Sequence, residues 1–347
     1  MWNTAGLVFA ALIAGCLAAP TAQAAPFAYI TNQGSHDVSV IDLALLRVVA
    51  TVPVGRAPAG VVAVGRASRV FVTNADGRSV SVIDMRSQAQ VATLAGFGEG
   101  SGPVGIDASA DGTHLFVADW FANRLLVWQH LAALQASSEP WALAVGRAPA
   151  GVAASADAST VYVAERDDNS VAVVDVAARR VRGRVQVGEH PFALLLDEAR
   201  SRLFVLNVLS DNISVIDTLS LKVSATIKVG KAPYGAALAA GGTLLYVSNQ
   251  HDDTVSVIDM HNLQVVRTLQ GFGYPEGVAA YADRVLVVNW MDDCVSVLNA
   301  ADGAELARIP TGRNSRGFGA FIGAPAERVQ PALAALTHPS RTQDSKP

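Results

Sequence analysis

Cysteine is scarce in this sequence. Only Cys16 and Cys294 occur among the 347 residues, and Cys16 lies within an apolar leader. A single cysteine in the body of the chain cannot form an internal disulfide, which excludes a disulfide-stabilised scaffold. No C-x-x-C-H segment is present, so covalently attached c-type haem is excluded as well. Cys294 stands at a repeat position where other copies carry Asp37, Ser79 or Thr254, and we expect it to pack rather than react.

Basic charge is lacking too. The chain has 26 Lys and Arg residues against 30 Asp and Glu residues, which gives a formal net charge of −4. Nucleic-acid-binding domains carry a basic excess, so no nucleic acid partner is expected. The sequence also lacks a G-x-S-x-G elbow, a phosphate-binding loop and a pair of carboxylates at a fixed catalytic spacing. Hydrophobic residues make up 51% of the chain, which is ample for a core.

The first 24 residues form an apolar leader that ends in the small-x-small pattern Ala22-Gln23-Ala24. This pattern predicts a signal peptide over residues 1–24 and a periplasmic or secreted protein. The segment IAGC at residues 13–16 supports an alternative, in which Cys16 is lipidated and anchors a lipoprotein. Contact with a membrane is expected only in that second case.

A short apolar segment recurs along the chain. It reads DVSVIDL at residues 37–43 and returns as SVSVIDM (79–85), SVAVVDV (170–176), NISVIDT (212–218), TVSVIDM (254–260) and CVSVLNA (294–300). A second marker is a proline that precedes a run of small residues. It falls at Pro58, Pro103, Pro149, Pro191, Pro233 and Pro275, with Ser315 in its place in the last copy. Successive markers are 40 to 46 residues apart, which predicts seven structural units.

Each unit carries four strand-like segments. Between residues 233 and 276, GAALAA is a run of small residues, TLLYVSN and LQVVRTLQ alternate, and TVSVID is apolar on both faces. Turn residues separate these segments, among them Asp259 at the end of its strand. Four antiparallel strands per unit, repeated about an axis, predict an all-β fold: a seven-bladed β-propeller.

Two details assign places to the strands. Pro53 and Pro310 fall where other copies carry Gln186 and Lys228, and a proline within a sheet belongs on its edge, so this strand is the outermost. The strand after each marker contains Gly or Ala near its start, as a crowded axis requires.

The two ends of the chain complete one blade. The mature chain opens with FAYITN, which matches a second strand, and its last strand-like segment, RGFGAFIG, matches a first strand. We therefore expect the N- and C-terminal segments to share the closing blade, with the propeller over residues 25–323. Residues 324–347 are rich in proline and polar residues and are predicted to be a disordered tail.

The units FAYITNQGSHDVSVIDLALLRVVATVPVG and LLYVSNQHDDTVSVIDMHNLQVVRTLQG resemble those of the YVTN-repeat family of β-propellers. The resemblance covers nearly the whole mature chain and implies the fold. It leaves the activity open, because related propellers include accessory proteins of quinoprotein and haem pathways, cell-surface proteins, lactonases and a lyase.

Candidate functional residues gather on one face of such a ring. The loops between second and third strands lie there, together with the crossings from each outer strand to the next inner strand, and loops on a rigid scaffold usually carry function. The residues next to the markers should surround the mouth of the central channel, and in four consecutive blades they are large or charged. We predict a ligand- or protein-binding site formed by His190, Phe192, Tyr234, Tyr274, Glu276 and Arg316.

Two functions stay open on this basis, and a third, an adhesion or surface-layer component, would gain support if Cys16 were lipidated. The first is an exported, non-catalytic protein that binds a ligand or a partner protein at the loop-rich face; the family resemblance adds service to a periplasmic, quinoprotein-like redox system. The alternative is a propeller enzyme of lyase or lactonase type, with His190, His251 and Glu276 as acid–base or metal-holding groups. His36 and Glu165 could extend a metal site, but no short ligand spacing supports one. No catalytic residue, metal or cofactor is predicted.

Overall fold

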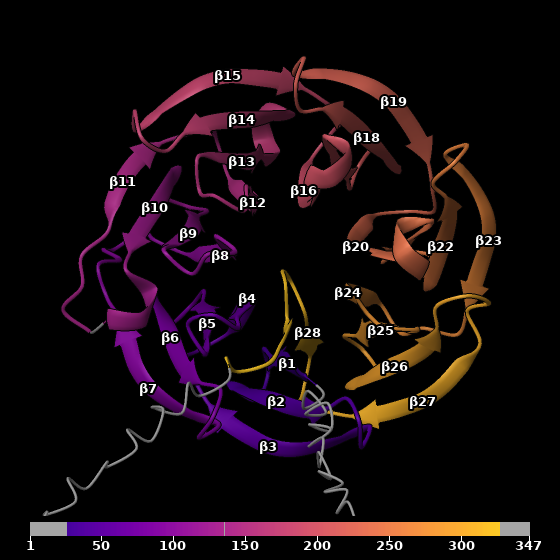
Figure 1. Cartoon of the computed structure of the whole chain (residues 1–347), viewed down its shortest axis with the longest axis horizontal. Helices are drawn as coiled ribbons and strands as arrows, with labels where there is room; N and C mark the ends of the chain where they lie inside the picture. The colour runs from indigo at the N-terminus through magenta and orange to yellow at the C-terminus, as the bar shows by residue number, and fades with distance from the viewer. Residues whose placement is uncertain (1–25, 135, 327–347) are drawn as a thin grey trace, which may run out of the picture.

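The computed structural model describes residues 26–134 and 136–326. The predicted signal peptide, with Cys16, and most of the predicted tail lie outside these ranges. The described chain forms seven antiparallel sheets around a central axis, and each sheet runs from an inner strand at the axis to an outer strand at the rim (Figure 1). The fold predicted from the repeats, a seven-bladed β-propeller with four strands in each blade, is confirmed.

The blades follow one another around the ring in chain order (Figure 1). Blade 1 consists of β28 (Ser315–Arg316), β1 (Phe27–Asn32), β2 (Asp37–Asp42) and β3 (Arg47–Pro53), with β29 (Ile322–Gly323) also paired to β1; blade 2 of β4 (Pro58–Val64), β5 (Arg69–Asn74), β6 (Ser79–Asp84) and β7 (Ala89–Leu94); blade 3 of β8 (Pro103–Ala108), β9 (His114–Asp119), β10 (Arg124–Gln129) and β11 (Trp141–Ala144); and blade 4 of β12 (Pro149–Ala154), β13 (Thr160–Glu165), β14 (Ser170–Asp175) and β15 (Arg180–Gln186).

The remaining three blades have the same order of strands. Blade 5 consists of β16 (Pro191–Asp197), β17 (Arg202–Asn207), β18 (Asn212–Asp217) and β19 (Lys222–Lys228); blade 6 of β20 (Pro233–Ala239), β21 (Leu244–Asn249), β22 (Thr254–Asp259) and β23 (Gln264–Gln270); and blade 7 of β24 (Pro275–Tyr281), β25 (Arg284–Asn289), β26 (Cys294–Asn299) and β27 (Glu305–Pro310). Four single-turn 3₁₀ helices lie in connections: η1 (Leu131–Ala133), η2 (Arg166–Asp168), η3 (Glu198–Arg200) and η4 (Ala240–Gly242). Within the described ranges, none of the helices has the length and hydropathy of a membrane span.

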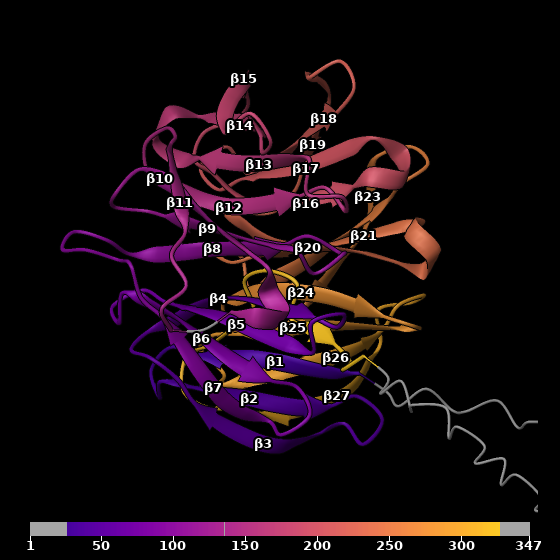
Figure 2. The same cartoon turned by 60° about the vertical axis from the view of Figure 1, so that its left-hand side comes forward.

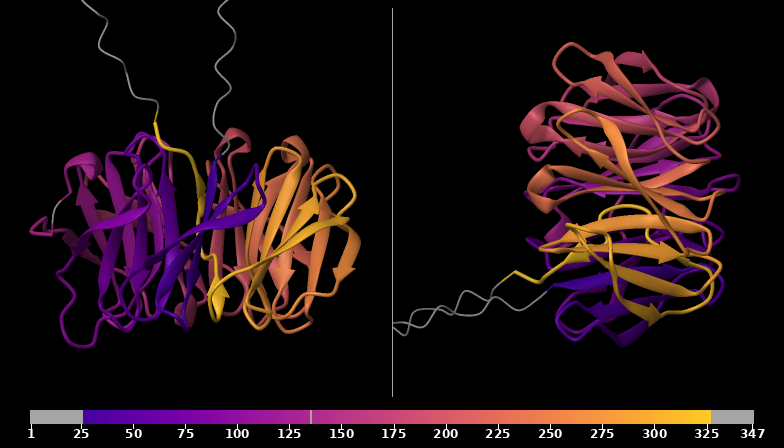
Figure 3. Two further views of the ribbon diagram at one scale, coloured as in Figure 1. Left: turned by 90° about the horizontal axis from the view of Figure 1, so that it is seen from below. Right: turned by 90° about the vertical axis from the view of Figure 1, so that its right-hand side faces the viewer.

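The pattern of burial explains the strand sequences. Second and third strands such as β5 and β6 are buried on both faces over four consecutive residues, because each sheet is sandwiched between its neighbours. Outer strands such as β15 alternate between exposed and less exposed residues, and Pro53 and Pro310 end the outer strands β3 and β27 as predicted. The core is therefore a set of apolar layers between neighbouring blades. Figures 2 and 3 show the sheets of these blades packed face to face.

Blade 1 closes the ring with both ends of the chain, as predicted, but its inner strand is interrupted. Thr31 of β1 pairs with Arg316 of β28, and Ala28 pairs with Ile322 of β29. Between these two pairings the chain leaves β1 for the adjacent blade, where the carbonyl of Phe318 accepts a hydrogen bond from the Val61 N–H at 2.9 Å. This detour carries the Phe318 ring to the axis. The described chain ends at residue 326, held at the turn between β4 and β5.

The inner strands approach one another very closely at the axis. A Cβ added to Gly105 of β8 would lie 1.8 Å from the carbonyl oxygen of Ala150 in the next blade, and one added to Gly235 would lie 2.3 Å from that of Glu276. No real side chain tolerates such a contact. The expectation of small residues at a crowded axis is thus confirmed.

We predict that Gly105→Ala lowers the free energy of unfolding by about 3 kcal/mol, because the new methyl group forces the inner strands of blades 3 and 4 apart. Gly183→Ala is the matched control: its Cβ would meet nothing within 4 Å in the outer strand β15, so stability should change by less than about 0.5 kcal/mol. Urea unfolding of the two variants measures the difference. Equal stability would show that the inner strands of blades 3 and 4 have room for a methyl group.

Candidate functional site

The loop-rich face is held by a repeated contact between blades. The residue just before each third strand has a left-handed backbone, and in most blades its side chain accepts a hydrogen bond from an N–H of the following crossing. Asn169 accepts from His190 N–H at 3.0 Å, Asp211 from Ala232 N–H at 3.0 Å, and Asp253 from Tyr274 N–H at 2.9 Å. These contacts fix the backbone on which the predicted mouth residues sit.

Aromatic side chains fill the mouth of the channel. The ring of Phe192 lies 4.5 Å from that of Tyr234, 4.9 Å from that of Phe318 and 6.0 Å from that of Trp120, between centroids. Phe192, Tyr234 and Phe318 are each less than a tenth exposed. We call Trp120, Phe192, Tyr234 and Phe318 the aromatic plug. Burial raises the pKa of the Tyr234 hydroxyl, so this group stays protonated.

An ion pair lies beside the aromatic plug and closes the mouth of the channel together with it. Arg316 Nη2 donates to Glu276 Oε1 at 3.2 Å, and Arg316 Nε lies 3.2 Å from Glu276 Oε2. The amide of Gln250 donates to the same Oε1 at 2.9 Å. Only 1% of the Glu276 side chain is exposed, and burial raises its pKa to about 7 although Arg316 and Gln250 favour the charged form. Burial and the charge of Arg316 thus act in opposite directions on the pKa of the Glu276 carboxyl.

A more exposed group of side chains lies next to this pair. The hydroxyl of Tyr274 is 3.3 Å from His251 Nε2, and its ring is 5.6 Å from that of Trp290. Trp290 Nε1 in turn donates to Gln33 Oε1 at 3.4 Å. His251 is exposed, whereas Tyr274 and Trp290 are half-buried.

Five of the six predicted site residues thus lie close together. Phe192 and Tyr234 belong to the aromatic plug, Glu276 and Arg316 bind each other, and the charge of Arg316 acts on both Tyr234 and Tyr274. His190 stands apart: its backbone is clamped by Asn169, and its Nδ1 is buried without a hydrogen-bond partner among the described residues. Their role in binding stays a prediction. The structure shows that they pack into a closed surface instead of surrounding a hollow.

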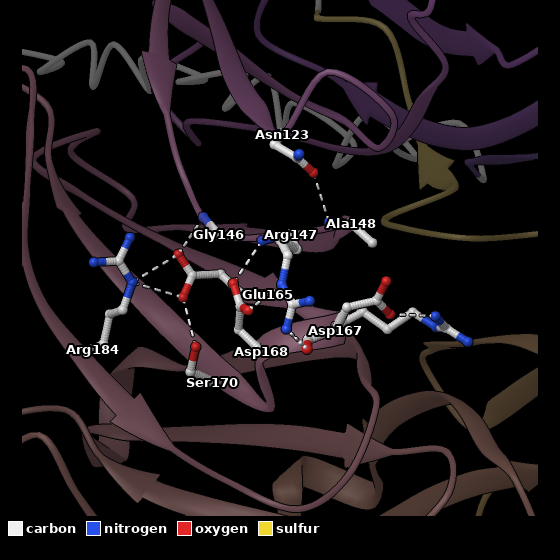
Figure 4. Close-up of polar contacts among 10 residues, drawn as sticks. Asn123, Gly146, Arg147, Ala148, Glu165, Asp167, Asp168, Ser170 and Arg184 are labelled. Carbon is white, nitrogen blue, oxygen red and sulfur yellow. Dashed lines mark hydrogen bonds and ion pairs between the residues drawn. The ribbon is translucent and has the colours of Figure 1, made fainter.

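The other candidates for a metal site have separate structural partners. Glu165 is completely buried and accepts hydrogen bonds from the Gly146 N–H at 2.7 Å, the Ser170 hydroxyl at 2.6 Å and Arg184 Nε at 2.9 Å (Figure 4). His36 Nδ1 accepts from the Ala57 N–H at 3.2 Å, as the Asp and Asn residues do in other blades. Across residues 26–134 and 136–326, no three His, Cys, Asp or Glu side chains gather in the manner of a metal site.

Sequence reasoning missed a cavity at the other end of the axis. The cavity has a volume of about 560 Å³, is lined by the inner strands of blades 3 to 7, and extends from Phe318 to exposed turns on the opposite, turn-rich face. Asp107 of β8 lines it. The signal was present in the sequence, because Asp107 is the one charged residue at the fourth position after a marker; other blades carry Val62, Ala153 or Leu195 there.

Comparison with solved structures supports the fold. A functionally unknown protein from Desulfotomaculum acetoxidans DSM 771 has a TM-score of 0.71 at 15% identity, over 86% of this chain and 99% of that one. Kuenenia stuttgartiensis hydrazine synthase has a TM-score of 0.67 at 20% identity, over 84% and 99%. The dihydro-heme d1 dehydrogenase NirN, in complex with DHE, has a TM-score of 0.64 at 16% identity, over 85% and 74%. No protein-family model matches the chain, nor does any curated protein sequence, and the resemblance to the YVTN-repeat family stays a prediction.

We predict that Arg316→Met destabilises the protein in a pH-dependent way. Removing one partner of a buried ion pair costs about 3 kcal/mol when the other partner stays charged. The pKa of Glu276 is already raised, so the folded protein binds a proton on this carboxyl more tightly than the unfolded chain does. The stability that this proton contributes is therefore lost as the pH rises through about 7. Without Arg316 the pKa rises further. The loss in stability should therefore be large at pH 8.5 and small at pH 5.5.

Arg308→Met provides the matched control in thermal unfolding. Arg308 pairs with Glu305 at 2.8 Å, but both side chains are about 40% exposed, and such pairs contribute less than about 1 kcal/mol. Its effect should be small at both pH values. The same loss for Arg316→Met at pH 5.5 and pH 8.5 would contradict a titrating Glu276.

Proposed function

We propose that this protein is an exported, non-catalytic binding propeller that docks a partner protein on its loop-rich face, as an accessory factor of a redox enzyme system in the cell envelope. The main support for this proposal is the closed mouth of the channel. The aromatic plug and the Glu276–Arg316 ion pair fill the centre of this face and make its surface continuous. Such a surface suits a macromolecule better than a small molecule, which needs a concave site.

Exposed apolar side chains surround that centre. Phe121 is 70% exposed, Leu209 56% and Met291 63%, and all three occupy the same position in the loop between second and third strands of their blades. Aromatic residues and methionine are enriched in protein interfaces. Charged side chains at the crossings form a polar surround: Arg147 pairs with Asp168 at 2.7 Å. An apolar group within a polar rim is the usual anatomy of a docking surface.

The proposal of a redox system takes support from the solved structures of similar fold. One of them is a dehydrogenase of dihydro-heme d1, and another is a hydrazine synthase. Identity to both is at most 20%, so they indicate a setting in which such propellers occur and no shared site. Export rests on the apolar leader over residues 1–24.

The enzyme alternative would draw on the raised pKa of Glu276, which suits an acid–base group. The three candidate catalytic groups, however, form hydrogen bonds with other residues or with none. Glu276 binds Gln250 and Arg316, and His251 contacts Tyr274. Among the described residues, the buried Nδ1 of His190 has no hydrogen-bond partner. A catalytic cluster would bring at least two of the three into one hydrogen-bonded group, so the geometry favours the binding function.

Site-specific photo-crosslinking in the producing cells tests the docking face. A photoreactive amino acid in place of Phe121, Leu209 or Met291 should give one discrete adduct in the periplasmic fraction, because these side chains would lie inside the interface. Mass spectrometry then identifies the partner. Leu45 and Leu219 are the matched controls, since they are 55% and 83% exposed on the opposite face and should give no adduct.

The triple variant Phe121→Ser/Leu209→Ser/Met291→Ser should abolish the same complex while its unfolding temperature stays within a few degrees of the parent protein's, because all three side chains are on the surface. Adducts formed equally from both faces, or only from Leu45 and Leu219, would contradict the proposal. An adduct found only in the cytoplasm would contradict the cell-envelope setting.

A further inference from the structure

The cavity on the turn-rich face has the form of a ligand site. Its volume of about 560 Å³ falls within the range of small-molecule pockets. Leu194, Leu195 and Leu196 of β16 and the small residues of the other inner strands give it an apolar wall. Phe318, in contact with Phe192 in the aromatic plug, limits it toward the loop-rich face, while Ala156 at its rim is exposed. It is therefore a pocket with one open end.

Asp107 is fixed inside this pocket by the backbone. Its Oδ2 accepts a hydrogen bond from the Ala154 N–H of the neighbouring blade at 2.8 Å, and its Oδ1 accepts from the Ala108 N–H at 2.8 Å. A carboxylate offers about four acceptor sites, so two remain for a ligand. Among the described residues no cation pairs with Asp107. Burial raises its pKa to about 6, even though both backbone hydrogen bonds favour the ionised form.

The charges along the wall have one sign. Two of the lining residues are ionisable, Asp107 in the interior and Glu198 at the rim, and both are acids. At neutral pH an uncompensated carboxylate in apolar surroundings is costly, and a bound cation would remove that cost. A wall of this kind disfavours anions and favours a cation with an apolar body.

We propose that the turn-rich face carries a binding site for a small organic cation, an alkylammonium whose apolar body lies along the β16 leucines and whose nitrogen donates to Asp107. The site lies on the opposite side of the aromatic plug from the docking surface. It therefore goes beyond the proposed function and stands whether or not a partner protein docks on the loops.

Isothermal titration of the purified protein with three probes of equal length tests this inference. Hexylammonium, hexanol and hexanoate are unbranched six-carbon molecules that differ in their head group. At pH 7.5 hexylammonium should bind about 10- to 100-fold more tightly than hexanol, because a charge-assisted hydrogen bond replaces a neutral one. Hexanoate should not bind.

Variants distinguish the contribution of Asp107 to binding from that of the apolar wall. Asp107→Asn keeps the shape and an acceptor for the Ala154 N–H, and it should reduce hexylammonium affinity at least tenfold without affecting hexanol. Asp283→Asn, at an acid that is 82% exposed on the same face and outside the cavity lining, is the matched control and should change either affinity less than threefold. Leu195→Trp fills the pocket and should abolish binding of both probes, with circular dichroism as the check on folding.

The pH profile supplies a further readout. Hexylammonium affinity should fall as the pH decreases through about 6, because protonation neutralises Asp107; Glu198 is the other titratable group that lines the cavity. The Asp107→Asn variant should lose this dependence. Equal binding of all three probes, hexylammonium binding unchanged by Asp107→Asn, binding unaffected by Leu195→Trp, or no binding of hexylammonium at all would each overturn the proposal. Changes at Phe121, Leu209 and Met291 should leave amine binding intact, so failure here is distinct from failure of the docking proposal.

Discussion

Seven inner strands meet at the axis so closely that the backbone of one blade lies against a carbonyl of the next, and the rest of the structure depends on this contact. The Val104 carbonyl faces the Cα of Gly60 and also accepts a hydrogen bond from the Thr73 hydroxyl at 2.8 Å. The Glu276 carbonyl of blade 7 likewise lies against Gly235 of blade 6 and accepts a hydrogen bond from the Ser248 hydroxyl at 2.6 Å. Any side chain at these glycines would break the junction between blades.

Small residues at the axis leave room that large side chains fill at one end only. The aromatic plug and the Glu276–Arg316 pair close the loop-rich end, and the inner strands of blades 3 to 7 leave a cavity at the other end. The two faces therefore differ in form: the loop-rich face is a continuous surface with exposed apolar side chains, and the turn-rich face opens into an acidic pocket. One structural detail separates them, the interrupted inner strand of blade 1 that brings Phe318 to the axis.

The fold could be predicted from the sequence because each of the seven repeats carries the same pattern of strands and turns. Six of the seven inner strands begin at a marker proline, the last begins at Ser315, and Pro53 and Pro310 mark the outer edge. The location of Phe192, Tyr234, Glu276 and Arg316 near the axis could be predicted as well, since the position after each marker places them, while their role in binding stays a prediction. Phe318 could not, because its place depends on a hydrogen bond to Val61 of a neighbouring blade. Asp107 carried a signal, a charge in an apolar strand, but only the assembled ring shows that this position lines a cavity. Whether large side chains at the mouth surround a hollow or fill it depends on how their volumes pack, which no local pattern encodes.

The central claim is that the axis is closed at the loops and open at the turns onto an acidic, apolar pocket. Thiol modification of an Ala279→Cys variant tests it directly, because Ala279 lines the cavity and the native Cys294 is buried. Methanethiosulfonate reagents that carry a quaternary ammonium or a sulfonate are similar in size and opposite in charge. The new thiol should react with both, faster with the cation, and the preference should disappear when Asp107 is changed to Asn. A thiol that reacts with neither reagent, or at equal rates with both, would contradict an open and acidic pocket.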